Sequence, residues 1–183
     1  MKSKKGILIA IAILVIICIL LIGIMLLGTS QLSEAEQFVN DFLTAYQEKD
    51  PTVGRFLSAS VFGNSEMSFE GFQGYIAETL TFTITGERTD VSDPETIWVD
   101  VEIENIDVIE IFTELESSNE LNPVRMQEQA IEMMNSPDAP RRVFQVSILV
   151  MDAQVGMFIQ MNEELSDALL GGFPTYISSG LGL

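Results

Sequence analysis

The pattern of apolar and polar positions divides the chain into an apolar N-terminal run and a longer mixed remainder. Residues 7–27 contain neither a charged residue nor a proline. A helix of that length rises 1.5 Å per residue and spans about 31 Å, which matches the hydrocarbon core of a bilayer. The pattern therefore predicts a transmembrane helix over residues 7–27, preceded by a short N-terminus of residues 1–6.

Four kinds of N-terminal segment contain an apolar run of this type. A secretory signal has an apolar region of only about 7–15 residues before a small-residue cleavage site, so cleavage at the Gly-Thr-Ser of residues 28–30 is disfavoured. A lipoprotein leader needs a small residue before its cysteine, whereas bulky Ile17 precedes Cys18. A prepilin leader carries glutamate at the fifth position after the cut, where this chain has Ile11. An uncleaved signal anchor is the interpretation that these residues favour.

The charges beside the run predict its orientation. Lys2, Lys4 and Lys5 precede it, and the flank that follows is acidic. The positive-inside rule then places the N-terminus in the cytoplasm and the C-terminal domain outside. We expect a single-pass protein of the cell membrane, with the lipid bilayer as a partner through residues 7–27.

An apolar stripe at spacings of three and four predicts the first helix of the remainder. Ser33 and Glu36 have the spacing of a capping box, and Pro51 ends the helix. The stripe consists of Ala35, Phe38, Val39, Phe42, Ala45 and Tyr46. Shorter helices are expected over residues 52–61 and 69–76.

Strict alternation of apolar and polar residues then predicts a hairpin. One strand has Leu80, Phe82 and Ile84 on its apolar face, and the next has Val99, Val101 and Ile103. A polar Asp-Pro turn separates them, so they are expected to pair in an antiparallel arrangement.

The C-terminal half predicts two helices, a second hairpin and a closing helix. Asp107 caps the first helix, and Asn122 followed by Pro123 begins the second. The inward face of that second helix is expected to hold Met126, Ala130, Ile131 and Met134.

Two strands follow around residues 152–154. They are apolar on both faces, so we expect them to be central and covered. A short helix ends at Gly171 and Gly172, which suit left-handed conformations. The predicted α+β domain covers residues 33–173, and residues 174–183 are expected to form a loose tail.

Composition excludes several classes of function. The 183-residue chain carries 27 acidic residues, and only 6 of its 9 basic residues follow residue 30. Such an acidic domain repels nucleic acid, which needs lysine and arginine to displace counterions. The length after the apolar run corresponds to one domain. Cys18 is the only cysteine and histidine is absent, which excludes intramolecular disulfides, Ser-His-Asp and Cys-His catalysis, and sites built on cysteine or histidine ligands.

The order of elements resembles the nuclear transport factor 2-like superfamily, also called cystatin-like. The segments that carry the resemblance are residues 35–50, 99–112 and 162–173. More narrowly, the chain resembles small extracytoplasmic domains of unknown function in Gram-positive bacteria. The resemblance implies a cone-like domain with a curved antiparallel sheet of about four strands packed by helices. Such domains often carry tryptophan on the final strand, where this chain has Met157 and Phe158. The shared segments are structural and transfer no function.

Three carboxylates, of Asp100, Glu102 and Glu104, share one face of a predicted strand. Alternate strand residues lie about 6.6–7 Å apart, whereas calcium needs oxygens within about 2.3–2.6 Å of one ion. These residues are therefore predicted to form a solvated outer face. Trp98 shares that face, either as an exposed contact anchor or as an edge residue covered by the loop at residues 93–94.

An enzyme that uses a cone cavity would need a carboxylate or tyrosine inside it, with a pKa shifted by burial. Tyr46, Tyr75 and Asp41 are the candidates, but no catalytic signature accompanies them. The prediction is that the chain is not an enzyme, with no catalytic, cofactor-binding or metal-ligating residue. The expected inward-facing set is Phe42, Phe82, Val101, Met126, Met134, Ile148, Val150, Met157 and Ile159.

That set leaves either an adaptable apolar cavity or a filled core. The sequence favours a membrane-anchored, extracytoplasmic, non-catalytic binding or accessory module. Its partner would be another envelope protein or a small apolar ligand. The alternatives are a structural or secretion-machinery component with a pilin-like leader, and an enzyme that uses the cone cavity.

Overall fold

The computed structural model describes residues 32–58, 67–89, 92–93, 95–117, 122–153 and 156–180. The chain divides into two compact units, Met1–Ser33 and Glu34–Leu183. All of the helices and strands below belong to the second unit.

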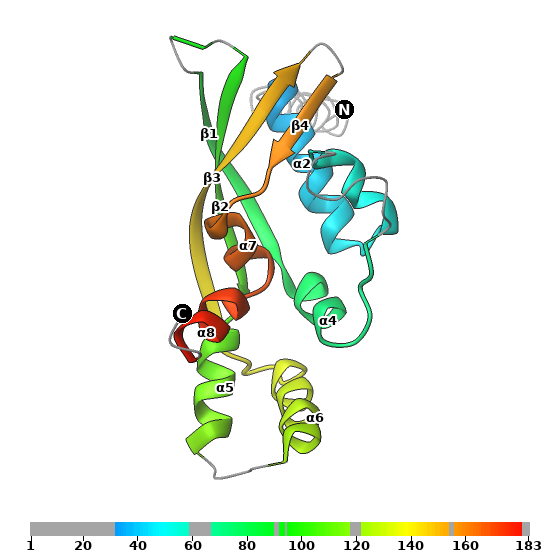
Figure 1. The fold of residues 1–183 in the computed structure, drawn as a ribbon, viewed down its shortest axis with the longest axis vertical. Coiled ribbons are helices and arrows are strands. Elements are labelled where there is room, and N and C mark those ends of the chain that lie inside the picture. The colour runs from blue at the N-terminus through cyan, green and yellow to red at the C-terminus, as the bar shows by residue number, and fades with distance from the viewer. Residues whose placement is uncertain are drawn as a thin grey trace, which may run out of the picture. The chain divides into compact units, whose positions relative to one another are not determined.

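The second unit is an α+β domain built on a four-stranded antiparallel sheet, as predicted (Figure 1). The strands are β1 (Thr81–Thr89), β2 (Thr96–Ile106), β3 (Arg141–Ala153) and β4 (Gly156–Gln160), in the spatial order β1-β2-β3-β4. Both strands of the second hairpin were expected to be central, but only β3 is an inner strand. The five-residue β4 forms an edge.

The register confirms the alternation in the sequence. Phe82 pairs with Ile103 and Ile84 with Val101, after which the register of β1 shifts by one residue before Gly86. Along β2, Val99, Val101 and Ile103 are buried on one face. These three residues pair in β3 with Ile148, Val146 and Phe144.

Helices cover the buried face of the sheet. They are α2 (Glu34–Gln47), α4 (Phe72–Thr79) and α7 (Glu163–Leu169), together with the 3₁₀ helix η1 (Pro51–Phe56) (Figure 1). The apolar stripe of α2 packs on the sheet through Val39, Phe42 and Leu43, each fully buried. Burying side chains of this size stabilises the fold by roughly 1.5–3 kcal/mol each.

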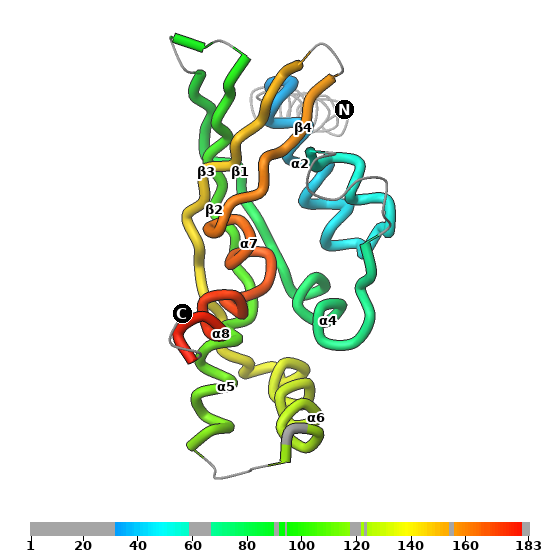
Figure 2. Tube along the Cα trace, in the orientation of Figure 1, coloured from blue at the N-terminus to red at the C-terminus, as the bar shows by residue number. Residues whose placement is uncertain are grey.

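A second apolar cluster lies where α5 (Val108–Ser117), α6 (Pro123–Met134) and α8 (Phe173–Gly180) meet α4. The Cα trace shows α5 and α6 as neighbours that connect β2 to β3 (Figure 2). Asp107 Oδ1 accepts a hydrogen bond from Glu110 N at 3.1 Å, and Asn122 Oδ1 accepts one from Val124 N at 3.0 Å. The two helix caps expected from the sequence are therefore present.

The C-terminal residues differ from the expectation of a loose tail, because residues 173–180 form α8. Phe173 and Tyr176 pack against Phe112, with ring centroids 6.1 and 5.1 Å away. These aromatic contacts with α5 supply the apolar burial that a short helix needs to be stable.

Asn105 joins the two clusters and is the one fully buried polar side chain in the part of the chain that the structure describes. Its Nδ2 donates to the carbonyl oxygens of Ala168 at 3.0 Å and Leu169 at 3.2 Å. Its Oδ1 accepts from Ile106 N at 2.8 Å and lies 3.0 Å from the hydroxyl of Thr79. One amide thus links polar groups of α4, β2 and α7 and leaves none of its own buried atoms without a partner.

The predicted membrane-spanning helix and the membrane localisation need correction. Among the described residues, no helix is both long enough and apolar enough to cross a bilayer. The segment 7–27 on which the prediction depended lies outside those residues, as does the N-terminus at 1–6. A single-pass protein with an N-terminal anchor is therefore not supported.

Candidate binding site

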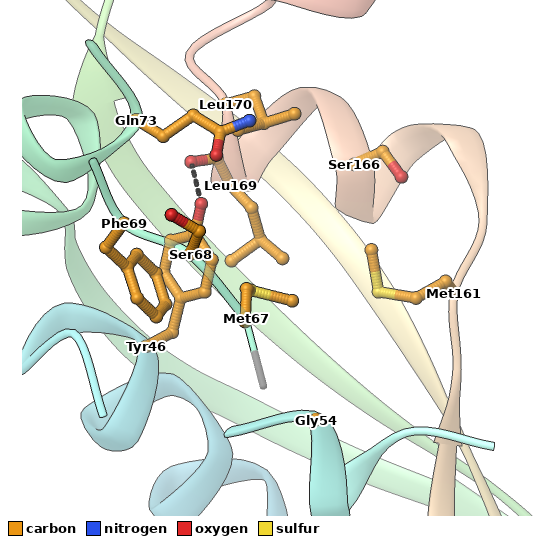
Figure 3. Close-up of a pocket in the computed structure, with 10 residues that line it drawn as sticks. All are labelled: Tyr46, Gly54, Met67, Ser68, Phe69, Gln73, Met161, Ser166, Leu169 and Leu170. Atoms are coloured by element: carbon orange, nitrogen blue, oxygen red, sulfur yellow. Dashed lines mark hydrogen bonds between the residues drawn. The ribbon is translucent and has the colours of Figure 1, made fainter. Parts of the chain in front are cut away.

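An apolar pocket of about 410 Å³, open on one side, lies between α2, η1, α4 and α7 (Figure 3). A pocket of this volume falls in the range that small-molecule sites occupy, about 300–1,000 Å³. We call it the apolar pocket. Its lining consists of Tyr46, Gly54, Met67, Ser68, Phe69, Gln73, Met161, Ser166, Leu169 and Leu170.

The aromatic wall of the apolar pocket depends on the short segment before α4. Phe69 packs edge-on against Tyr46, with ring centroids 5.3 Å apart. Met67 N donates to Pro51 O at 3.0 Å, which ties this segment to the start of η1. A Cβ on Gly74 would lie 2.4 Å from Phe69 O, so a glycine is needed for α4 to pack this closely against the backbone of Phe69.

The start of η1 is fixed by a side-chain cap. Asp50 Oδ1 accepts hydrogen bonds from both the backbone N and the hydroxyl of Thr52, each at 2.8 Å. These bonds hold the pKa of the Asp50 carboxyl below its usual value. The cap fixes the turn from which Gly54 faces the pocket.

Tyr46 closes one side of the pocket and is itself only 4% exposed. Its hydroxyl donates a hydrogen bond to Leu169 O at 3.1 Å, the dashed line in Figure 3. Burial raises the pKa of this phenol far above its usual value. The hydroxyl therefore stays protonated and engaged, which makes it a structural donor and a poor proton-transfer group.

A second, more polar hollow of about 690 Å³ adjoins the apolar pocket. Met161, Ser166 and Leu170 line both. We call the second one the acidic hollow, because its charged lining side chains are those of Glu163 and Asp167. Asp167 also accepts hydrogen bonds from the backbone N of Thr175, at 3.0 Å, and from its hydroxyl.

The three side chains expected for an enzyme are not brought together. Tyr46 lines the apolar pocket, while Tyr75 is half-buried in the second cluster with α5 and α6. Asp41 is exposed on α2 and accepts a hydrogen bond from Gln37 Nε2 at 2.6 Å.

The carboxylates of β2 have separate partners along the outer face. Ser147 Oγ lies 2.5 Å from Asp100 Oδ1, and Gln145 Nε2 lies 2.7 Å from Glu102 Oε2. Glu104 pairs with Arg141, and the distance between Glu104 Oε1 and Arg141 Nε is 2.5 Å. Nowhere in the described ranges do three His, Cys, Asp or Glu side chains gather as they would around a metal ion.

Trp98 is half-buried on the same outer face as these carboxylates. The guanidinium of Arg88 lies over its ring, 5.2 Å from the centroid. Arg88 Nη2 also donates to Ser147 Oγ at 3.0 Å. Trp98 is thus covered by its neighbour on β1, while Pro94 of the loop expected to cover it lies outside the described residues.

The nine side chains expected around a cavity do not line the apolar pocket. Phe42, Val101, Ile148, Val150 and Ile159 are buried in the main core, which they help to fill, and Phe82 and Met157 pack at its margin. Met126 and Met134 belong to the second cluster instead. The pocket lies on the helical side of the domain. Met161, which was not among the nine, lines it in place of the expected methionines.

Most of the residues that form the pocket were not predicted from the sequence. Met67 and Ser68 lie in a glycine-rich stretch whose spacing predicts no regular element, and Phe69 was expected to begin a helix that starts only at Phe72. Met161 follows β4, outside the alternation that places strand residues. The only signal for these pocket residues was composition, because two methionines and a phenylalanine lie beside short helices.

Comparisons of the chain with protein-family models, with curated proteins and with solved structures find no match.

Proposed function

We propose that the chain is a non-catalytic binding module and that its apolar pocket takes a small apolar ligand. The observation that carries this proposal is the pocket itself, about 410 Å³ lined mainly by aromatic, leucine and methionine side chains. Ligand sites of proteins typically combine such an apolar lining with a few polar groups, here Ser68, Gln73 and Ser166. Met67 and Met161 add adaptability, since methionine repacks around ligands of different shape.

The lining favours binding over catalysis. Tyr46 is the titratable residue of the apolar pocket, and its hydroxyl is already bonded to Leu169 O. An enzyme would need an acid, base or nucleophile free to act on the ligand.

We also infer that the domain has the cone-like form of the nuclear transport factor 2-like superfamily, with a curved sheet. The support is the four-stranded antiparallel sheet packed by helices, which is the architecture that the resemblance implies. A ligand pocket lined by helices beside such a sheet fits this reading, and function has still to be argued from the site.

The test is the binding of N-phenylnaphthylamine, a neutral dye that fluoresces in apolar surroundings, to the full-length chain. Ser166→Phe puts a ring at the wall of the pocket, while Ser166→Ala keeps the wall small. We expect the parent chain and Ser166→Ala to bind the dye alike, and Ser166→Phe to bind less. The difference between the two variants cancels dye taken up elsewhere, including by residues 7–27. Equal dye binding by both variants would overturn the proposal.

A further inference from the structure

We propose that the ligand is a cationic amphiphile, whose apolar body occupies the apolar pocket and whose positive charge lies at the acidic hollow. This inference rests on the proposed function, because it adds a charge requirement to the same site.

The two hollows adjoin at the side chains that they share. Met161, Ser166 and Leu170 belong to both linings, so a molecule longer than the apolar pocket extends past them to Glu163 and Asp167. Figure 3 shows Met161 and Ser166 together at one side of the pocket, away from Tyr46 and Phe69. An apolar chain with a polar end therefore has one favourable orientation.

The charge at that end is negative, and the guanidinium of Arg88, which lines a third hollow together with Glu163, is paired with Asp100. The residues that line the two hollows include Glu163 and Asp167 but neither lysine nor arginine. Ion pairs instead join Glu78 to Lys49, Asp100 to Arg88 and Glu104 to Arg141. An anionic amphiphile would meet two carboxylates without a counter-charge, whereas a cationic one would gain from both.

The field of the whole chain acts in the same direction. A net charge of −18 attracts cations and repels anions at long range. Glu163 is exposed, so its attraction for a bound cation is screened by solvent and salt. We therefore expect a preference of a few-fold for a cationic ligand.

The experiment is displacement of N-phenylnaphthylamine from the full-length chain by three ten-carbon amphiphiles, each below its micelle-forming concentration. They are decyltrimethylammonium, decanol and decanoate, which share a chain and differ in charge. We expect decyltrimethylammonium to displace the dye at roughly twofold to fivefold lower concentration than decanol, and decanoate to be the weakest. Added salt should reduce these differences.

Two neighbouring carboxylates provide a matched pair of variants. Glu163→Gln removes a charge that lines the acidic hollow, while Glu164→Gln removes one that lines neither of the two hollows. Both change the net charge equally. We expect only Glu163→Gln to bring the cationic and neutral competitors closer together.

Each outcome is decisive. If the dye binds at the pocket but all three competitors displace it alike, the charge requirement is wrong and the proposed function stands. The requirement is also wrong if Glu163→Gln and Glu164→Gln have the same effect, because net charge alone would then explain the preference. If Ser166→Phe shows that no dye binds at the pocket, both proposals fail.

Discussion

Replacement of Asn105 by aspartate should make the stability of the domain strongly dependent on pH. Asn105→Asp keeps the size of the side chain and the oxygen that accepts from Ile106 N, but its protonated carboxyl can donate only one of the two hydrogen bonds that the amide donates to Ala168 O and Leu169 O. Those two bonds contribute about 1 kcal/mol each to the free energy of unfolding. A carboxylate would also face two carbonyl oxygens at a site that is 0% exposed.

Burial of the charge adds the pH-dependent part of the cost. A buried carboxyl has its pKa raised by about 3 units or more, and each unit corresponds to 1.36 kcal/mol. The Ile106 N and Thr79 donors still favour the charged form, so we take about 3 units, or about 4 kcal/mol. Because the folded pKa lies above the unfolded value of about 3.9, this cost is absent below that pH and grows as the pH rises toward the folded pKa. The total loss should be about 1 kcal/mol near pH 4 and about 5 kcal/mol near pH 7.

Urea unfolding of the full-length chain, followed by circular dichroism at several pH values, measures this difference against the parent. Asn105→Ala is the control for the lost amide, and its cost should vary little with pH. Asn122→Asp is the control for a new carboxylate, because Asn122 is an exposed helix cap whose accepted bond an aspartate retains. A loss for Asn105→Asp that is the same at pH 4 and pH 7 would refute the assignment of Asn105 as a buried donor.

Four further outcomes are expected. Gly171→Ala should lower the free energy of unfolding by more than about 3 kcal/mol, because the φ of Gly171 is 61° and a Cβ would lie 2.3 Å from Ile106 O. Gly86→Ala is the control and should change the free energy of unfolding little, because no atom lies within 4 Å of its new Cβ. Denaturant unfolding compares the two variants. Tyr46→Phe should cost about 1 kcal/mol by thermal unfolding, since Leu169 O loses a donor. Burial and the hydrogen bond to Glu116 raise the pKa of Tyr176 to about 12. The pKa of Tyr176, measured by ultraviolet titration, should therefore fall toward 10 in Glu116→Gln. In the parent chain, the raised pKa stabilises the fold at lower pH, and this contribution is lost as the pH rises through 12. Added salt should raise the melting temperature, because it screens the repulsion within a chain of net charge −18.

The strands and long helices were predictable because their burial repeats along the chain. The alternation through Phe82 and Ile84 and through Val99, Val101 and Ile103 leaves only one face that can be buried, so the hairpin and its register follow. The stripe of α2 works in the same way at helical spacing. The caps at Asp107 and Asn122 were also readable, because capping is local.

Asn105 shows what the same alternation could have revealed. It follows Ile103 by two residues, so the period of β2 places it on the buried face. A buried asparagine requires partners, but the sequence does not show that they come from α7, more than sixty residues later. The identity of the partners depends on tertiary packing.

The candidate site was the least predictable part. Apart from Tyr46 of the α2 stripe, it is built on a short 3₁₀ helix, an irregular segment around Phe69 and the short helix α7, none of which has a long repeating pattern. Short elements of this kind take their conformation from the contacts around them. The spacing of Phe173 and Tyr176, three residues apart, was a local signal for α8 that the prediction of a loose tail did not use.

The register shift in β1 also bears on how the domain avoids growing into larger sheets. β1 and β4 are the two edges of the sheet, where another copy of the chain could add a strand. On β1, an incoming strand would lose its pairing at the irregularity between Ile84 and Gly86 and would then meet the charges of Glu87 and Arg88. On β4, Leu57 already bridges to Ile159, and Ser58 N donates to Ile159 O at 3.2 Å. Both edges are therefore poor templates for aggregation.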